Sequence, residues 1–190
     1  MSDIEVPEAS DKKLNHAVAI TVVLFGTVMA VTNVKDDNIV QAMQLVKTEV
    51  VDTWSEYQAN RLKSHISNAA LMQNQALRAV ATPAMVPVME GYEAKLKENI
   101  ERYEKKSDDL FKKAKDLEKK VEVLSFRDDQ FDISEALLSV SMSIIGVAAL
   151  IESWMLLSVA WACGGVGVLF SIAGFAGWSI YIGSLAKFLT

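Results

Sequence analysis

Charged residues are almost absent from the last third of the chain: between Ala136 and Ala186 only Glu152 is charged. One helical crossing of a bilayer takes about 20 apolar residues, so this stretch is long enough for two crossings. Because a carboxylate deep in hydrocarbon is costly, we expect Glu152 in a turn between the two crossings. A turn at Gly164-Gly165 is the alternative, and it would bury Glu152. The pattern predicts a membrane protein and excludes a single soluble domain.

Reactive side chains are also scarce. The chain has one cysteine, Cys163, and two histidines, His16 and His65, which stand far apart. A single cysteine excludes an intrachain disulfide and a cysteine-based metal site. No nucleophile–base pair or metal cluster is visible, so we expect neither an enzyme nor a bound cofactor. The net charge of −5 argues against nucleic acid binding.

A further apolar stretch lies near the N-terminus. Residues 1–13 are polar, and residues 14–34 carry no formal charge, which suffices for one crossing. A cleaved signal peptide with Lys12 and Lys13 as its basic region is the alternative, but the acidic start favours an uncleaved anchor. The expected segments are a polar tail (1–13), three transmembrane helices (14–34, 132–152 and 154–184) and an extramembrane region (35–131).

Proline is rare, and two of the three prolines, Pro83 and Pro87, lie in the middle of the extramembrane region. Proline disfavours a continuous helix, so we expect two helices, at about 38–81 and 90–124, joined by a turn. Both carry apolar residues at three- and four-residue spacing, with a phase slip near Trp54. The first stripe is Met43, Val46, Val50, Tyr57, Leu62, Ile66, Ala69, Leu77 and Val80. The second stripe is Leu96, Tyr103, Leu110, Ala114, Leu117, Val121 and Leu124. The fold class expected is all-α, with a long antiparallel coiled-coil hairpin between the first and second spans.

Small residues four apart mark the third span. Such spacing lets helix backbones approach closely in a membrane. The candidate helix-packing residues are Ala160, Gly164, Gly167, Ser171, Ala173, Gly177 and Gly183. Because one hairpin buries only a narrow seam, we expect a homo-oligomer that assembles through the coiled coil and this small-residue face.

Two carboxylates, Asp132 and Glu135, lie one helical turn apart at the start of the second span. An acid followed three residues later by Glu, before an apolar run, is typical of a capping box. We therefore interpret Asp132 as the N-cap of the second span. The alternative is an ion site at the mouth of an oligomeric pore.

Four residues of the first hairpin helix share one face by their spacing, namely Trp54, Tyr57, Gln58 and Arg61. An aromatic layer in the coiled-coil seam is the favoured interpretation, and a recognition patch is the alternative.

The turn between the hairpin helices is apolar from Ala79 to Met89 except for Thr82. An apolar tip far from the membrane is not expected to stay exposed. Contact with neighbouring subunits is the default expectation, and an envelope partner or a second membrane is the alternative.

Three short blocks resemble a known family. They are Trp54-Ser55-Glu56-Tyr57-Gln58-Ala59, Arg102-Tyr103-Glu104-Lys105 and Phe131-Asp132-Ile133-Ser134-Glu135-Ala136. Together they are similar to the DUF4337 family of bacterial integral membrane proteins. The resemblance implies the layout described above and no mechanism, because the family carries no established activity. Family members place basic residues before the third span, where this chain has Glu152.

The sequence thus predicts a bacterial inner-membrane, multi-pass protein in contact with lipid, acting as a self-assembling structural or scaffolding component. An oligomeric ion channel or transporter subunit is the alternative, although no polar stripe runs through any span. Lys12 and Lys13 against Asp36 and Asp37 favour a cytoplasmic N-terminus and a periplasmic hairpin. Arg127, close to the second span, argues for the reverse orientation.

Overall fold

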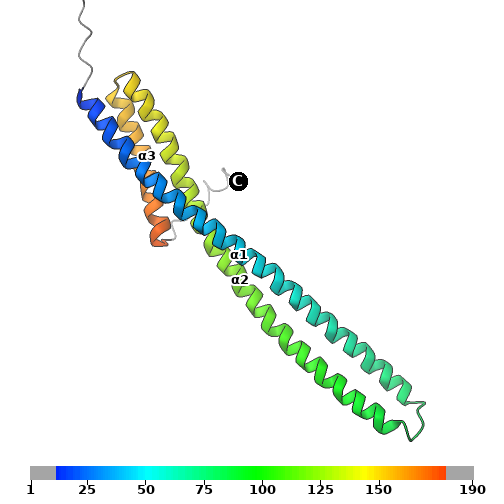
Figure 1. The fold of residues 1–190 in the computed structure, drawn as a ribbon. Helices are drawn as coiled ribbons and strands as arrows, with labels where there is room; N and C mark the ends of the chain where they lie inside the picture. Colours follow the sequence, from blue (N-terminus) through cyan, green and yellow to red (C-terminus); the bar gives the residue numbers. More distant parts are fainter. Residues whose placement is uncertain (1–11, 179–190) are drawn as a thin grey trace, which may run out of the picture. The chain divides into compact units, whose positions relative to one another are not determined.

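The computed structural model describes residues 12–178, and these form three helices without a strand (Figure 1). Helix α1 spans Lys12–Arg78, α2 spans Val86–Leu150 and α3 spans Trp154–Ala176. Each contains a stretch long and apolar enough to cross a membrane. The prediction of an all-helical chain with three long apolar helices is confirmed.

Helices α1 and α2 are each continuous, although the sequence pattern predicts two separate segments in each of them. Residues 14–34 and 38–78 belong to α1, and the second hairpin helix and second span are both part of α2. No Gly or Pro lies between those segments to break the helix. Helix α2 also begins at Val86 rather than Glu90, because Pro87 falls in its first turn, where its missing N–H has no helical partner to lose.

The turn between α2 and α3 contains Ile151, Glu152 and Ser153, so Gly164 and Gly165 lie inside α3. Glu152 adopts a left-handed conformation (φ 53°), and Ser153 is the N-cap of α3, its hydroxyl accepting from the N–H of Leu156. Helix α3 ends at Ala176, before the expected end at residue 184, because Gly177 (φ 68°) forms a left-handed C-cap. Residues 179–184 lie outside the described part.

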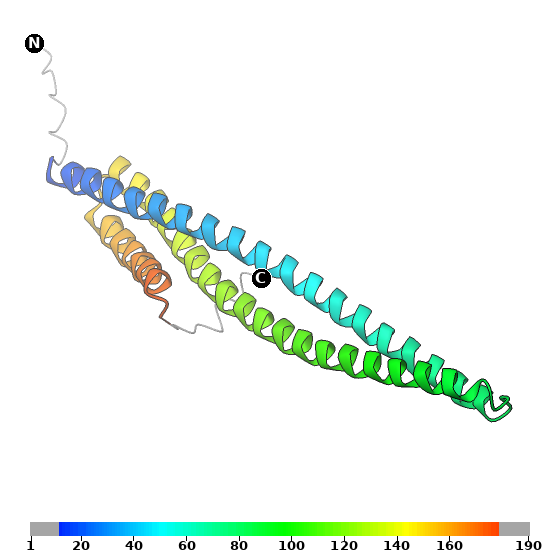
Figure 2. The same ribbon diagram turned by 60° about the horizontal axis from the view of Figure 1, so that its bottom comes forward.

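The chain divides into two compact units. The first comprises the described residues of Met1–Ala42 and Val123–Thr190 and contains a three-helix bundle. Figure 2 shows α3 beside the α1 and α2 segments of this unit. Its core includes Leu14 from α1, Ile145 and Ala148 from α2, and Leu157 and Ala160 from α3.

The second unit, Met43–Glu122, contains the other parts of α1 and α2, which lie side by side in both views (Figures 1 and 2). Glu49 pairs with Lys113 (2.8 Å) and Glu56 with Lys106 (2.7 Å), so later residues of α1 meet earlier residues of α2. On α2 the apolar stripe expected from the sequence faces α1, and its Leu96, Leu110 and Ala114 are buried.

The expected α1 stripe follows the seam only at its start. Met43 and Val46 are buried, but Leu62 and Ile66 are each 60% exposed. The assignment of Leu62, Ile66, Leu77 and Val80 to the same seam is therefore wrong. The phase slip near Trp54 rotates the apolar stripe off the seam, and small polar residues replace it. The buried polar positions of this segment are Thr53, Asn60, Ser64, Ser67 and Asn74.

Candidate functional site

Carboxyl groups from two helices meet in the first unit. Asp36 comes from α1, and Asp128, Asp132 and Glu135 recur along α2 at four- and three-residue spacing, which keeps them on one face. The side chain of Asp36 lies within hydrogen-bonding reach of Asp128. The Oδ1 atoms of Asp36 and Asp128 are both buried without a hydrogen-bond partner. We call these four residues the acidic layer.

The environment of the acidic layer favours the protonated form of Asp36. Burial, followed by the charges of Asp128, Asp132 and Glu135, raises the pKa of its carboxyl from 3.8 to about 7. Burial, and then the charge of Asp128, also raises the pKa of Asp129. The raised pKa means that the Asp36 carboxyl titrates closer to neutral pH than an ordinary aspartate does.

The N-cap interpretation of Asp132 is wrong, because α2 passes through Asp132 and Glu135 without a break. Asp132 is exposed, whereas Glu135 is half-buried. With its amide turned so that nitrogen faces the acceptors, Asn33 donates to Glu135 Oε1 and to the Met29 carbonyl, both at 2.6 Å. Within residues 12–178 no three His, Cys, Asp or Glu side chains are arranged to hold a metal ion.

Side chains from one turn of α2 hydrogen-bond to the backbone at the C-terminal end of α3. Arg127 Nη2 donates to the carbonyls of Gly174 (3.2 Å) and Phe175 (3.5 Å), and Gln130 Nε2 donates to the carbonyl of Trp178 (2.7 Å). These carbonyls have no partner inside α3, so the contacts cap its C-terminus. The fully buried Phe131 ring completes the contact, since a Cβ built on Gly174 would lie 2.7 Å from that ring. No local pattern in the sequence indicates these pairings.

The small residues of α3 face the other two helices of the same chain. A Cβ on Gly164 would overlap the Phe25 ring and would lie 2.7 Å from Ser141 Oγ. A Cβ on Gly167 would lie 3.1 Å from the Ser134 carbonyl. These glycines let α3 approach α1 and α2 closely, so this face is filled from within the chain.

The other members of that candidate set fall in different places. Ala160 and Ala173 are fully buried, and the carbonyl of Ala160 accepts from Ser141 Oγ at 2.7 Å. The hydroxyls of Ser171 and Thr32 hydrogen-bond at 2.7 Å, which joins α3 to α1. Gly177 is exposed at the C-cap of α3, and Gly183 lies outside the described residues.

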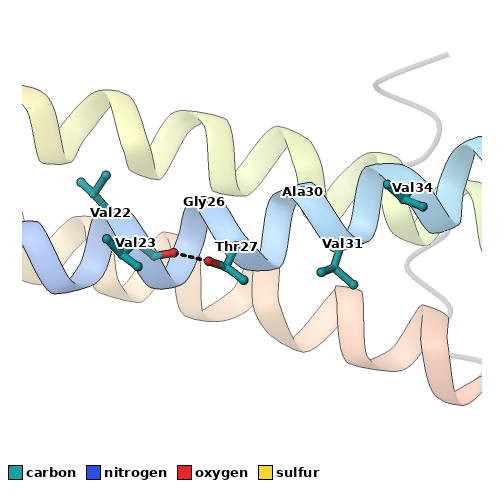
Figure 3. A pocket seen from close by; sticks show the side chains of 7 residues that line it. All are labelled: Val22, Val23, Gly26, Thr27, Ala30, Val31 and Val34. Atoms are coloured by element: carbon teal, nitrogen blue, oxygen red, sulfur yellow. Dashed lines mark hydrogen bonds between the residues drawn. The ribbon is translucent and has the colours of Figure 1, made fainter.

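The outward face of α1 in the first unit forms a shallow apolar groove (Figure 3). A Cβ built on Gly26 meets no atom within 4 Å. The one hydroxyl in the groove, on Thr27, donates to the Val23 carbonyl at 2.7 Å and leaves no unsatisfied donor. The groove is lined by Val22, Val23, Gly26, Thr27, Ala30, Val31 and Val34.

In the second unit Trp54 and Tyr57 form an aromatic cluster with Phe111 of α2. The ring centroids are 5.4 Å apart for Trp54 and Tyr57 and 5.7 Å apart for Trp54 and Phe111, both edge-to-face. Trp54 Nε1 donates to Glu118 at 2.9 Å, and Lys115 lies over the Trp54 ring. Gln58 and Arg61, expected on the same face, are exposed.

A family model described as a domain of unknown function, DUF4337, matches residues 14–177. The chain belongs to this family. Neither the curated proteins nor the solved structures contain a match to it. In this DUF4337 chain the family-like blocks carry the contacts described above: Trp54 and Tyr57 build the aromatic cluster, and Phe131 packs on Gly174. In the block between them, Arg102 lies over the Tyr103 ring, 5.2 Å from its centroid.

The turn joining α1 to α2 is held by polar contacts at its base. Asn74 Nδ2 donates to the carbonyl of Met89 at 3.1 Å, and Arg78 pairs with Glu90 and Glu93. The apolar side chains beyond this base, including those of Val80, Met85 and Val88, are exposed. The expectation that the tip from Ala79 to Met89 contacts another molecule stays a prediction.

Proposed function

We propose that this DUF4337 chain is a three-crossing membrane protein without enzymatic activity, serving as a self-assembling structural or scaffolding component. The observation that carries the membrane part is the outer surface of the three-helix unit, where large apolar side chains point away from the bundle. Such a surface is unfavourable in water and suited to hydrocarbon. The exposed apolar residues include Ile20, Val23, Leu24, Leu150, Met155, Val159 and Leu169.

Several polar side chains in the spans are hydrogen-bonded within the chain, as a hydrocarbon environment favours, although the buried hydroxyl of Ser134 has no partner in the described part of the chain. Thr21 Oγ1 donates to the Ala17 carbonyl and accepts from Trp161 Nε1, each at 2.8 Å. Ser143 and Ser158 donate to backbone carbonyls of their own helices. Serines that are engaged in this way do not supply a polar path, which supports a scaffolding role over a channel.

The second unit supports an extramembrane, antiparallel coiled-coil hairpin between the first two crossings. Its ion pairs between helices, such as Glu49–Lys113, lie on exposed side chains that need water. The α3 small-residue face is occupied within the chain, so assembly falls to α1, whose groove from Val22 to Val34 has no covering element in the described part. The proposed intramembrane assembly surface is therefore the α1 groove and not the small-residue face of α3.

A subunit of an oligomeric ion channel or transporter is the second candidate function. The acidic layer favours it, because a carboxyl such as Asp36, whose pKa is raised toward neutral pH, can accept and release protons beside a membrane entrance. Location in a bacterial inner membrane, with a cytoplasmic N-terminus and a periplasmic hairpin, is part of the same proposal and draws on Lys12 and Lys13.

Topology tests the proposal directly. In a Cys163→Ser background, Met85→Cys marks the hairpin tip and Glu152→Cys marks the turn between α2 and α3. A membrane-impermeant maleimide added to sealed, uniformly oriented vesicles is expected to label only one of them. Labelling of both from the same side would overturn the three-crossing arrangement.

Assembly is tested on the full chain in lipid nanodiscs by mass photometry. A dimer or larger species is the expected result, and a monomer at all protein-to-lipid ratios would remove the scaffolding proposal. Proton flux into liposomes that contain the full chain tests the second candidate function. Flux that is lost in Asp36→Asn supports a channel or transporter, and background-level flux through the parent chain argues against one.

A further inference from the structure

The face of α1 that turns away from α2 carries a regular apolar repeat in the second unit. Seven positions alternate in spacing by three and four residues, and only Gln73 among them is polar. Leu62 and Ile66 are each 60% exposed, and Val80, in the turn just beyond the end of α1 at Arg78, is 82% exposed. We call these positions the outer stripe. They are Ala59, Leu62, Ile66, Ala69, Gln73, Ala76 and Val80.

The opposite face of the same segment is polar although it is buried. Asn60, Ser64 and Ser67 are all less than 10% exposed and line the seam with α2. In a hairpin that acts alone, burial stabilises apolar residues in the seam and polar residues stay outside. The reversed arrangement places the larger apolar surface of α1 outside, where water alone gives it no favourable contact.

We propose that the outer stripe is the seam of a parallel two-stranded coiled coil between two copies of this chain. The inference rests on the proposed function, because anchoring both copies through the membrane-crossing part of α1 makes their α1 helices run in the same direction. The spacing of the stripe gives a and d positions of a heptad, with Leu62 and Ala69 at d and Ile66 and Gln73 at a.

The distribution of charge favours a second copy of the outer stripe, rather than the outward face of α2, as the surface that packs against it. The outward face of α2 is charged along its length, for example at Glu98, Arg102 and Lys105, and would press charges against apolar side chains. The stripe itself is bordered by nearly neutral flanks, since Lys63 is the only permanently charged residue among them. In a parallel pair Lys63 lies beside Gln58 of the partner subunit, so no like charges meet. The flanking residues are Gln58, His65, Met72 and Ala79 on one side and Lys63, Ala70 and Leu77 on the other.

Gln73 is also suited to pairing with Gln73 of a second copy of the chain. A single polar residue at an a position fixes the register and the number of strands of a coiled coil. Across a two-fold axis each Gln73 amide can donate to the other and accept from it. An unrelated apolar partner would leave this amide without a hydrogen-bond partner.

The size of the stripe indicates where the pairing occurs. The helical part of the stripe, from Ala59 to the end of α1 at Arg78, spans about 30 Å, and a strip one helix diameter (about 10 Å) wide covers roughly 300 Å² per copy. This is less than the ~800 Å² per partner of a typical stable interface in solution. Anchoring in one bilayer raises the effective concentration of the copies and makes the smaller interface sufficient.

Disulfide crosslinking of the full chain in nanodiscs tests the inference. In the Cys163→Ser background, Ala69→Cys places a thiol in the stripe and Arg61→Cys places one on an exposed face outside it. Equivalent d positions of a parallel coil lie close enough for a disulfide. We expect Ala69→Cys to crosslink about tenfold faster or more than Arg61→Cys. Equal rates at the two positions would overturn the inference.

A charge substitution distinguishes failure of this inference from failure of the proposed function. Leu62 and Leu45 are both exposed leucines of α1, but only Leu62 lies in the stripe. Leu62→Lys is expected to weaken self-association by about 100-fold, as loss of an interface hot spot does, while Leu45→Lys leaves it unchanged. If both variants assemble like the parent chain, the stripe inference fails and self-assembly stands. If the parent chain is itself monomeric, both fail.

Discussion

The carboxyl group of Asp36 on α1 lies within hydrogen-bonding reach of the carboxyl group of Asp128 on α2. Two ionised carboxylates repel, so this contact is favourable only when one of them keeps its proton. The Oδ1 atom of each is buried without a partner, which adds to the cost of a second negative charge. The pair therefore links the packing of α1 on α2 to pH.

The first prediction concerns stability against pH. The pKa of Asp36 is raised to about 7 in the folded chain, from 3.8. Between pH 4 and pH 7 the unfolded chain loses this proton while the folded chain retains it. The contribution of Asp36 to stability is thus fully present below pH 4 and is lost as the pH rises through 7. Thermal unfolding in detergent, followed by tryptophan fluorescence, measures this decline.

Asp36→Asn is the variant that isolates the effect. An amide cannot ionise, so the melting temperature of Asp36→Asn is expected to fall less between pH 5 and pH 8 than that of the parent chain. Asp116→Asn, at an exposed acid of α2, serves as the control and should keep the parent's pH dependence. An identical decline in Asp36→Asn and the parent would contradict the assignment.

The second prediction compares two adjacent glycines of α3. Gly164 faces the Phe25 ring and Ser141 with no space for a methyl group, whereas a Cβ on Gly165 meets nothing within 4 Å. Gly164→Ala is expected to destabilise the three-helix unit by about 1–3 kcal/mol through overpacking. Gly165→Ala should be neutral or should stabilise the helix by up to about 1 kcal/mol. Melting temperatures of the two variants in the same detergent give the comparison.

A compensating substitution checks the cause. If the Phe25 ring is the obstacle, Phe25→Leu combined with Gly164→Ala should recover part of the lost stability, giving a coupling energy between the two positions. Strictly additive effects would show that Gly164 is needed for another reason.

The third prediction concerns the aromatic cluster of the second unit. Phe111→Ala removes the α2 ring that contacts both Trp54 and Tyr57. Because Phe111 is partly exposed, the expected loss is about 1–2 kcal/mol, below the 3–5 kcal/mol of a fully buried ring. Faster amide hydrogen exchange around Trp54 and Phe111, with unchanged exchange in α3, is the expected signature. Uniformly faster exchange along the whole chain would contradict a local role.

The sequence predicted those features that depend on local composition. Apolar run length was enough for three long apolar helices, and the α2 stripe through Leu96 and Leu110 was found from its spacing alone. Contacts between distant segments were not accessible in this way. The bonds from Arg127 to the end of α3 join residues 47 and 48 positions apart, and no local pattern encodes them.

Two interpretations from the sequence are wrong, each for a different reason. The cap at Asp132 assumed that a helix starts where the apolar run starts, but a polar segment without Gly or Pro continues the helix through it. The α1 stripe was assigned to one seam because spacing gives the side of a helix and not its partner. The burial of Asn60 and Ser64, together with the exposure of Leu62, shows that the apolar side of α1 faces outward beyond Tyr57.

The last prediction follows from Gln73. At an a position of the proposed coil, a polar residue lowers stability and restricts the register, so Gln73→Leu is expected to strengthen self-association and to relax the register. Crosslinking between a chain with Ala69→Cys and a chain with Ala76→Cys, both lacking Cys163, detects a one-heptad shift. This mixed crosslink should be nearly absent with Gln73 and should rise several-fold with Gln73→Leu. A mixed crosslink that is equally rare in both backgrounds would show that other contacts set the register and that Gln73 does not.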